Sequence, residues 1–460
     1  MKRIAALVGC ALAIILGAVG CALAPATPTA VLAWLAVLSC GYIGGLLLTA
    51  TGKRSRATFL LMVAIAVIAR GILITAPAVL EDDVNRYLWD GAVTRSGVNP
   101  FRFTPQTVYD ARVGRVLNVS EDDVKTLNQL AVLSRTPRLD NAFLGINYPS
   151  VPTIYPPVTQ LVFASGAAIA PGSVTMLKLI MVGFDLSCAL ALWLIMVRLK
   201  RPRRWLLVYL WNPAIILAFS GSAHMDSIPL CLLLFAIAAA LSKRRIASGI
   251  LLGAAASAKL FPLLAWPALR HRLGKSGTVS AALTLALSYL LFWIGPQMFD
   301  GLRTFATRWQ INAPIFGPLA WIVGDRPARI AIALVIVAIT LVVGANRHKQ
   351  DPPAAMIAAI AIALSALVLA SPAVNPWYVA WLVPFAALGP RLWPALAAVS
   401  VTVLMSYWRF VDPGSSGELP WQLIAIQFTI PAVIAIWIIS QPTDIINFHK
   451  NAVTKSVDVA

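Results

Sequence analysis

The sequence predicts an all-α polytopic membrane protein, and three observations support this fold class. Of its 460 residues, 59% are hydrophobic and only 12% are charged, and the mean hydropathy is +0.80. Many windows of about 18 residues or more contain no charge, which is typical of membrane-spanning helices. These apolar runs are continuous and lack the strict alternation of barrel strands, which excludes a membrane β-barrel.

The net charge of +19 is concentrated in short segments between the apolar runs. These segments carry 21 Lys/Arg and 3 acids, a difference of +18 out of the total +19. Such a distribution predicts that they face the cytoplasm, with both termini inside, and it excludes a nucleic-acid partner. The segments are 1–3, 52–56, 198–204, 243–245, 270–275, 347–352, Arg391 and the C-terminal tail.

The apolar runs predict about 12 spanning helices. They cover residues 4–24, 29–50, 57–80, 174–198, 205–222, 227–242, 277–296, 328–345, 354–371, 377–389, 392–408 and 422–440. Lys2 and Arg3 before an apolar run also fit a signal peptide, so processing of the N-terminus stays open. All five cysteines lie in apolar segments, which gives no indication of disulfide bonds.

Two apolar segments are predicted not to cross. If 158–171 crossed, the basic cluster 198–204 would lie outside, so we expect a helix that stays on the outer side and starts at Pro156-Pro157. Both flanks of 246–269 are basic, which predicts a re-entrant hairpin of two half-length helices with its tip near 258–262. The long segment 81–157 then becomes one outer loop, too long for a simple connection.

Three consecutive acids, Glu81, Asp82 and Asp83, follow the third apolar run. Asp83, Arg86, Tyr87 and Asp90 have the spacing i, i+3, i+4, i+7, which places them on one face of a helix that begins near Asp82. A carboxylate in the first turn is favoured by the helix dipole, while its neighbours raise its pKa. Two interpretations remain open: an acidic cap paired with Arg86, or a general base.

The string 82–91 together with Gly97-Val98-Asn99-Pro100-Phe101 resembles the GT-C glycosyltransferases, and glycosyltransferase family 87, a group of mannosyltransferases, is the nearest named relative. The resemblance covers roughly residues 57–408. It adds Pro152-Thr153-Ile154-Tyr155-Pro156-Pro157, Trp211-Asn212-Pro213, Gly221-Ser222-Ala223-His224-Met225-Asp226, Ala258-Lys259-Leu260-Phe261-Pro262 and Asn375-Pro376-Trp377-Tyr378. One integral membrane domain, 1–460, is expected, with extra spans in 1–56, a GT-C-like core in 57–408, and a last span and tail in 409–460.

The resemblance implies an enzyme of the bacterial inner membrane that works on its outer, periplasmic face. It would move a hexose, with mannose expected first, from a polyprenyl-phosphate donor to a lipid or glycan acceptor, with inversion. An outer-loop acid acts as the general base in such enzymes. The Asp-x-x-Arg-Tyr spacing selects Asp83 for this role, and Asp82 is the alternative.

The resemblance also suggests residues that bind the substrates. Lys259 is the leading candidate for the donor phosphate, because a charge inside an apolar hairpin is costly unless it is paired; snorkelling to the interface is the alternative. The other candidates are Arg86, Tyr87, Asp90, Tyr155, His224, Asp226, Arg308, Asn375, Trp377 and Tyr378. Aromatic-belt anchoring explains the last three equally well.

No cofactor is predicted, and membrane lipids are the remaining partners. His224 and Asp226 could also ligate a divalent metal, although a hydrogen-bonding role fits better. Arg70 and Asp185 lie within apolar runs, where we expect them to pair with each other. The alternative function is a polytopic transporter or lipid flippase, but no inverted repeat is visible and the acids gather in one loop.

Overall fold

The structure is a computed structural model that describes residues 2–24, 27–50, 56–115, 118–345, 352–389, 393–411 and 419–441. Within them the regular elements are helices, apart from an isolated bridge between Ile311 and Ala373. Seven of these helices are long and apolar enough to cross a membrane, as in an α-helical multi-pass membrane protein. They are α1 (Lys2–Leu23), α2 (Pro28–Ala50), α3 (Arg56–Thr75), α9 (Val174–Arg198), α17 (Asp325–Ala345), α18 (Pro353–Ala370) and α22 (Trp421–Ser440).

Three segments predicted as continuous spans are interrupted: 205–222, 377–389 and 392–408. Asn212 stops the first of them, because its side chain accepts hydrogen bonds from two backbone N–H groups just after it and Pro213 begins a new turn. The pieces are η1 (Arg203–Leu206), α10 (Leu207–Leu210), α11 (Pro213–Ile215), the π-helical turn η2 (Ile216–Gly221), α19 (Pro376–Val379), α20 (Val383–Leu388), α21 (Trp393–Thr402) and the 3-10 turn η5 (Val403–Phe410). The total of about 12 spans stays a prediction.

The predicted hairpin reversal is present. After α12 (Ser227–Leu241), α13 (Arg245–Ala258) ends before Lys259, and the chain continues through η3 (Phe261–Ala265) into α14 (Trp266–Leu290), which kinks at Gly274. Gly277 lies against the Arg245 carbonyl and Gly253 against the Ala281 carbonyl, so the second half of α14 runs parallel to α13. The segment between them must therefore return to the end where α13 began.

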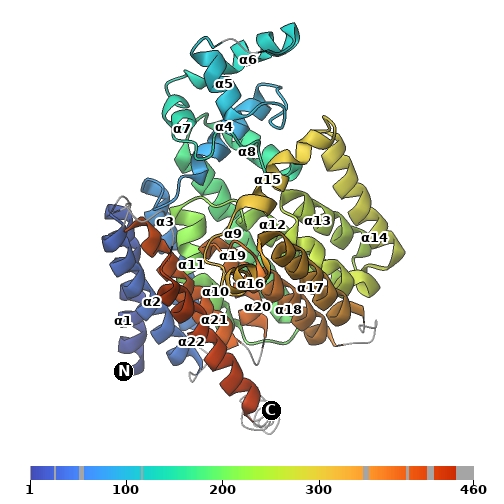
Figure 1. Cartoon of the computed structure of the whole chain (residues 1–460). Helices are drawn as coiled ribbons and strands as arrows, with labels where there is room; N and C mark the ends of the chain where they lie inside the picture. Colours follow the sequence, from blue (N-terminus) through green and yellow to red (C-terminus); the bar gives the residue numbers. More distant parts are fainter. Residues whose placement is uncertain are drawn as a thin grey trace.

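The helices of the outer loop and the helix that follows it project from one end of the molecule, away from the N-terminus (Figure 1). They are α4 (Asp83–Arg95), α5 (Pro105–Arg112), α6 (Glu121–Ser134), α7 (Asp140–Leu144) and α8 (Pro157–Ile169). The starts of α4 and α8 agree with the sequence expectation. Beside them lie η4 (Pro296–Phe299) and α15 (Asp300–Arg308), with Gly301 of α15 against the carbonyls of Pro152 and Thr153, while α16 (Phe316–Val323) lies in the helical body (Figure 1). Most of the basic residues in 52–56 and 347–352, with Arg391 and the tail 442–460, lie outside the described residues.

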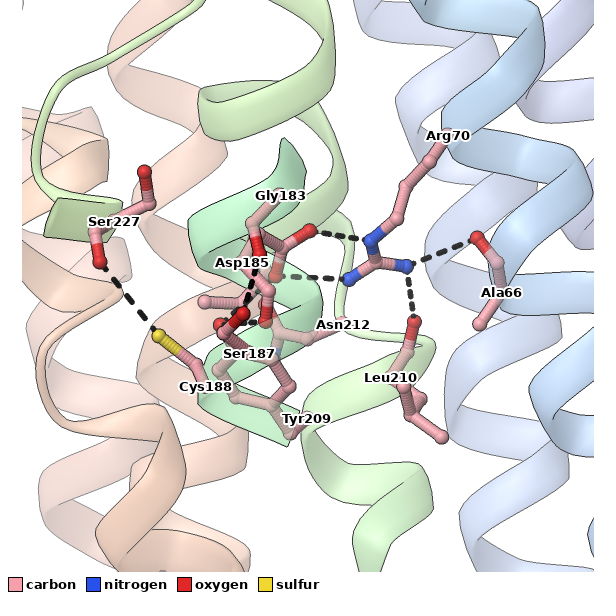
Figure 2. A network of polar contacts seen from close by, with 11 residues as sticks. Ala66, Arg70, Gly183, Asp185, Ser187, Cys188, Tyr209, Leu210, Asn212 and Ser227 are labelled. Atoms are coloured by element: carbon pink, nitrogen blue, oxygen red, sulfur yellow. Dashed lines mark hydrogen bonds and ion pairs between the residues drawn. The ribbon is translucent and has the colours of Figure 1, made fainter. Parts of the chain in front are cut away.

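Arg70 and Asp185 pair as predicted, and both side chains are buried. Figure 2 shows that Arg70 spans from α3 to Asp185 on α9 and also donates to the carbonyl oxygens of Ala66 and Leu210. The Tyr209 hydroxyl donates to Asp185 Oδ1 at 2.8 Å. Because every polar group in this pair has partners, it joins three elements without leaving a buried charge uncompensated.

Lys178, which the sequence did not single out, fixes the end of α3. Its Nζ donates to the carbonyl oxygens of Leu73, Ala76 and Pro77 at 2.8, 2.8 and 3.0 Å. The carbonyls at this helix end lack most of their helical partners because α3 ends at Thr75; Leu73 keeps a long bond of 3.3 Å from the Ala76 N–H. A cation there also suits the helix dipole. Lys178 thereby sets the position from which the chain enters the acidic run.

Candidate functional site

A cavity of about 2170 Å³ lies between the outer loop and the helical body. Its wall includes the acidic run 81–83, the hairpin break 258–261, the segment 375–378 and Arg409, with apolar side chains of α17 and α22. These segments are far apart in the sequence, and several of them carry the motifs predicted to form the site. The fold therefore brings these motifs to one common space.

Asp83 is the first residue of α4 and faces this cavity. Asn147 donates from Nδ2 to Asp82 Oδ1 at 2.6 Å and approaches Asp83 Oδ1 at 3.4 Å. Burial raises the pKa of Asp83 to about 6; the charge of Asp82 adds to this rise, while Asn147 and Lys259 oppose it. Asp82 is more exposed, and burial raises its pKa as well. A carboxylate with a pKa near neutrality is suited to accept a proton at physiological pH.

Glu81, the third acid of the run, faces Arg409. The Nη2 of Arg409 lies 3.5 Å from Glu81 Oε1, and Nη1 lies 3.5 Å from Asn375 Oδ1. Burial raises the pKa of Glu81 well above its usual value, an effect that Arg409 opposes and Asp83 reinforces. Both contacts are long for hydrogen bonds, so among the described residues the Arg409 cation lies beside the acids without a close hydrogen bond to them.

Lys259 sits in the hairpin break and lines the cavity. Its Nζ is 2.6 Å from Asp226 Oδ1, which also accepts from Trp381 Nε1 at 2.7 Å. The ammonium lies over the rings of Tyr378 and Trp381, 4.5 and 5.0 Å from their centroids. Asp226 is 1% exposed and Lys259 is 24% exposed. The carboxylate of the pair is therefore buried, and the ammonium is the part that the cavity can reach.

His224 lies behind Asp83 and is not part of the cavity wall, although it was predicted to bind substrate. Its fully buried ring stacks on Trp377, with centroids 3.8 Å apart. Its Nδ1 is 3.4 Å from the Tyr87 hydroxyl and 3.9 Å from Asp83 Oδ2. Burial lowers the pKa of His224 well below its usual value, and the charges of Lys259 and Arg409 add to the effect, so the imidazole is neutral.

Other predicted binding residues serve as supports in this structure. Arg86 lines the cavity, but it pairs with Asp90 at 2.8 Å rather than with the acidic run, and it donates to the Val151 carbonyl. Asp90 is buried outside the cavity wall, where it accepts hydrogen bonds from Thr153 and Gln160. This network fastens the end of the outer loop to α4.

The remaining predicted residues divide between the cavity and the surface. Tyr87 and Tyr155 line the cavity and make an edge-to-face contact with centroids 5.0 Å apart. Asn375, Trp377 and Tyr378 are also in the wall. Arg308 is exposed at the end of α15 and does not line the cavity.

Several residues of the site were not predicted. Asn147 and Trp381 contact the acids directly, and Arg326 and Arg329 of α17 line the cavity. Arg329 is bound by Asp325 and by the carbonyl of Ala306. The signal for Trp381 was its spacing from Trp377 and Tyr378, which places the three aromatic residues close together; Asn147 carries no local signal.

No group of three or more His, Cys, Asp or Glu side chains that could hold a metal ion occurs among the described residues. Asp226 is one of the two metal ligands considered from the sequence, and its Oδ1 already accepts hydrogen bonds from Lys259 and Trp381. Its immediate environment is thus that of an ion pair with an indole donor.

Comparisons with family models, curated proteins and solved structures give no match to this chain. A carboxylate of raised pKa stands in an open cavity with two cations nearby. Such a site can take a proton from a hydroxyl group while neutralising an anion formed beside it.

Proposed function

We propose that this chain is a membrane glycosyltransferase of the GT-C type that uses a polyprenyl-phosphate sugar as donor. The observation that carries the proposal is the shared cavity, in which Asp83 stands close to Lys259 and in which Arg409 also lines the wall. A base and two cations in the wall of one cavity match a reaction that removes a proton and releases a phosphate. The resemblance of the sequence motifs to family 87 supplies the donor class.

The transfer step requires no nucleotide. The acceptor hydroxyl oxygen attacks the anomeric carbon of the sugar, the bond from that carbon to the phosphate oxygen breaks, and its electron pair leaves with the polyprenyl phosphate. Asp83 takes the hydroxyl proton, and the ammonium of Lys259 and the guanidinium of Arg409 neutralise the leaving phosphate. Attack opposite to the leaving group inverts the anomeric configuration.

The apolar part of the cavity supports lipid-linked substrates. Ile330, Ala333 and Ile336 of α17 line it, as do Ile424, Phe428 and Val433 of α22. Many large apolar side chains of these two helices are exposed, as expected for surfaces that meet lipid. A polyprenyl chain can therefore lie against protein and bilayer while its phosphate reaches the cations.

The sugar, the acceptor and the membrane face are assigned from the same resemblance. We propose a hexose, mannose in the first instance, and a lipid or glycan acceptor. The cavity would face the periplasmic side of the bacterial inner membrane, because the outer loop projects from the end opposite to the N-terminus and the basic segments indicate the cytoplasmic side (Figure 1).

The test is sugar transfer by the purified protein reconstituted in lipid. Radiolabelled polyprenyl-phosphate mannose is offered with a membrane-lipid extract, and label is expected to move into a new glycolipid. Failure of the protein to bind the donor would overturn the proposal and favour a transporter. Donor binding without transfer to any acceptor, with mannose, glucose or galactose donors, would exclude the hexosyltransferase reaction.

The pH dependence of transfer is a separate expectation. Because the pKa of Asp83 is about 6 and the base must be ionised, kcat/KM should fall as the pH drops through about 6. Asp82→Asn removes a neighbouring negative charge, which should lower the pKa of Asp83 and move this acid limb to lower pH. If kcat/KM of Asp82→Asn falls at the same pH as that of the wild type, a group other than Asp83 controls the fall. The measurement is kcat/KM at saturating acceptor between pH 4 and pH 8.

A further inference from the structure

Residues 216–224 form an unusual backbone whose last residue is His224. The π-helical turn η2 precedes it, Ala223 has a left-handed φ of 57°, and the His224 N–H donates to the Ala218 carbonyl at 2.8 Å. Both π-turns and left-handed non-glycine residues cost free energy, and they are concentrated at functional sites. The chain therefore maintains a strained turn immediately before this imidazole.

The turn fixes the imidazole in one orientation. Trp377 covers one face of the ring at an interplanar angle of 20°, and Nδ1 points toward Asp83 and Tyr87. The other nitrogen, Nε2, is buried and has no hydrogen-bond partner among the described residues. Since His224 does not line the cavity, neither nitrogen is placed to contact a substrate.

The proton of the neutral ring is assigned by its neighbours. A lone pair on Nδ1 would face the Asp83 carboxylate, which is repulsive, whereas an Nδ1–H group would face an acceptor. The Tyr87 hydroxyl, the other group near Nδ1, can also accept from an Nδ1–H group, because a phenol oxygen both donates and accepts. The Nδ1–H tautomer therefore fits best, and it leaves Nε2 as a buried acceptor without a partner.

We infer that His224 is a positioning residue that directs its Nδ1–H at Asp83 and orients that carboxylate toward the acceptor hydroxyl. The inference rests on the proposed function in that Asp83 is taken as the base. The separation of 3.9 Å is longer than a hydrogen bond, and such contacts commonly shorten when substrate is bound. The Nδ1–H also favours the ionised form of Asp83, whose other charged neighbours are Asp82, Asp226 and Lys259.

Two amide substitutions separate this role from substrate binding. Asparagine carries an amide nitrogen near the position of Nδ1, and glutamine carries one near the position of Nε2. His224→Asn should retain most of the transfer rate. His224→Gln and His224→Ala should lower kcat by about 10- to 100-fold, the range seen for residues that orient a reactive group, with the donor KM unchanged. Asparagine is the smaller of the two and leaves the larger cavity at this fully buried position, so a packing defect would impair His224→Asn more than His224→Gln, the opposite of the expected order of activity.

The pH profile supplies a readout that a purely structural role would not change. Loss of the Nδ1–H donor should raise the pKa of Asp83, so the acid limb of kcat/KM should move to higher pH in His224→Ala and His224→Gln but not in His224→Asn. If Gln is active and Asn is not, Nε2 contacts the substrate and the inference is wrong. Equal kcat and equal acid limbs in all variants would also overturn it.

A measurement without substrate keeps the two proposals separate. Modification of Asp83 by a carbodiimide, followed site by site with mass spectrometry across pH, reports the protonation of this carboxyl directly. We expect the midpoint to rise in His224→Ala and His224→Gln relative to the wild type and His224→Asn. An unchanged midpoint would contradict the role of His224 even if wild-type transfer proves the enzyme, whereas a shifted midpoint without any transfer would count against the proposed function alone.

Discussion

Asp83→Asn should lower kcat by about 10²- to 10⁴-fold, the range for loss of a general base, while making the protein more stable. The amide keeps the shape of the side chain but cannot accept the proton. The gain in stability follows because burial and the neighbouring acid raise the pKa of Asp83 to about 6, from 3.8. An ionised Asp83 therefore opposes folding, and the neutral amide removes this cost.

The sign of the pH effect makes the prediction specific. Because the folded state binds the Asp83 proton more tightly than the unfolded state, wild-type stability should decrease as the pH rises from about 4 to about 6 and then level off. The difference from Asp83→Asn should be absent near pH 4 and reach at most about 3 kcal/mol above pH 6. Thermal unfolding in detergent as a function of pH measures it, beside the transfer rate.

Asp82→Asn is the matched control. It removes the adjacent carboxylate, which is more exposed and has the shorter contact with Asn147. Transfer should persist in this variant and be lost in Asp83→Asn. The opposite pattern would make Asp82 the base, and full activity in both variants would remove the acidic run from the chemistry.

Features determined by local sequence were predictable. Asp83 begins α4, as an acid in the first turn of a helical pattern predicts. A break near 258–262 was expected because both flanks of 246–269 are basic, and α13 does end at Ala258. The Arg70–Asp185 pair was predicted because few other partners are available to a charge within an apolar run. Each of these features depends either on a short stretch of sequence or on the high free-energy cost of an unpaired charge in an apolar segment.

Features that depend on long-range contacts were not predictable. Asn147 approaches the acids across 65 positions, and Trp381 reaches Asp226 across 155. The apolar segment 205–222 has the composition of a span, and only Asn212-Pro213 indicated the break. His224 could be recognised from the sequence as a residue of interest, but its place behind Asp83 depends on the stacked Trp377 and on the π-turn.

Lys259→Met should both destabilise the protein and abolish efficient transfer, whereas pairing it with Asp226→Asn should restore only stability. The single change leaves the Asp226 carboxylate, 1% exposed, without its cation, and breaking a buried pair typically costs about 3–5 kcal/mol. In the double variant neither position of the pair carries a charge, and the Trp381 N–H still has an oxygen acceptor. Thermal unfolding of the four proteins in this cycle measures the recovery.

Transfer should not recover with stability, because the leaving phosphate has lost a cation. Loss of one preorganised charge at such a position costs about 10²- to 10³-fold in kcat. Arg308→Ala removes a cation from the exposed end of α15, outside the cavity wall, and should change neither quantity. If the double variant regained the wild-type rate, Lys259 would serve only to neutralise Asp226, and the phosphate would have to be bound by Arg409 or the arginines of α17.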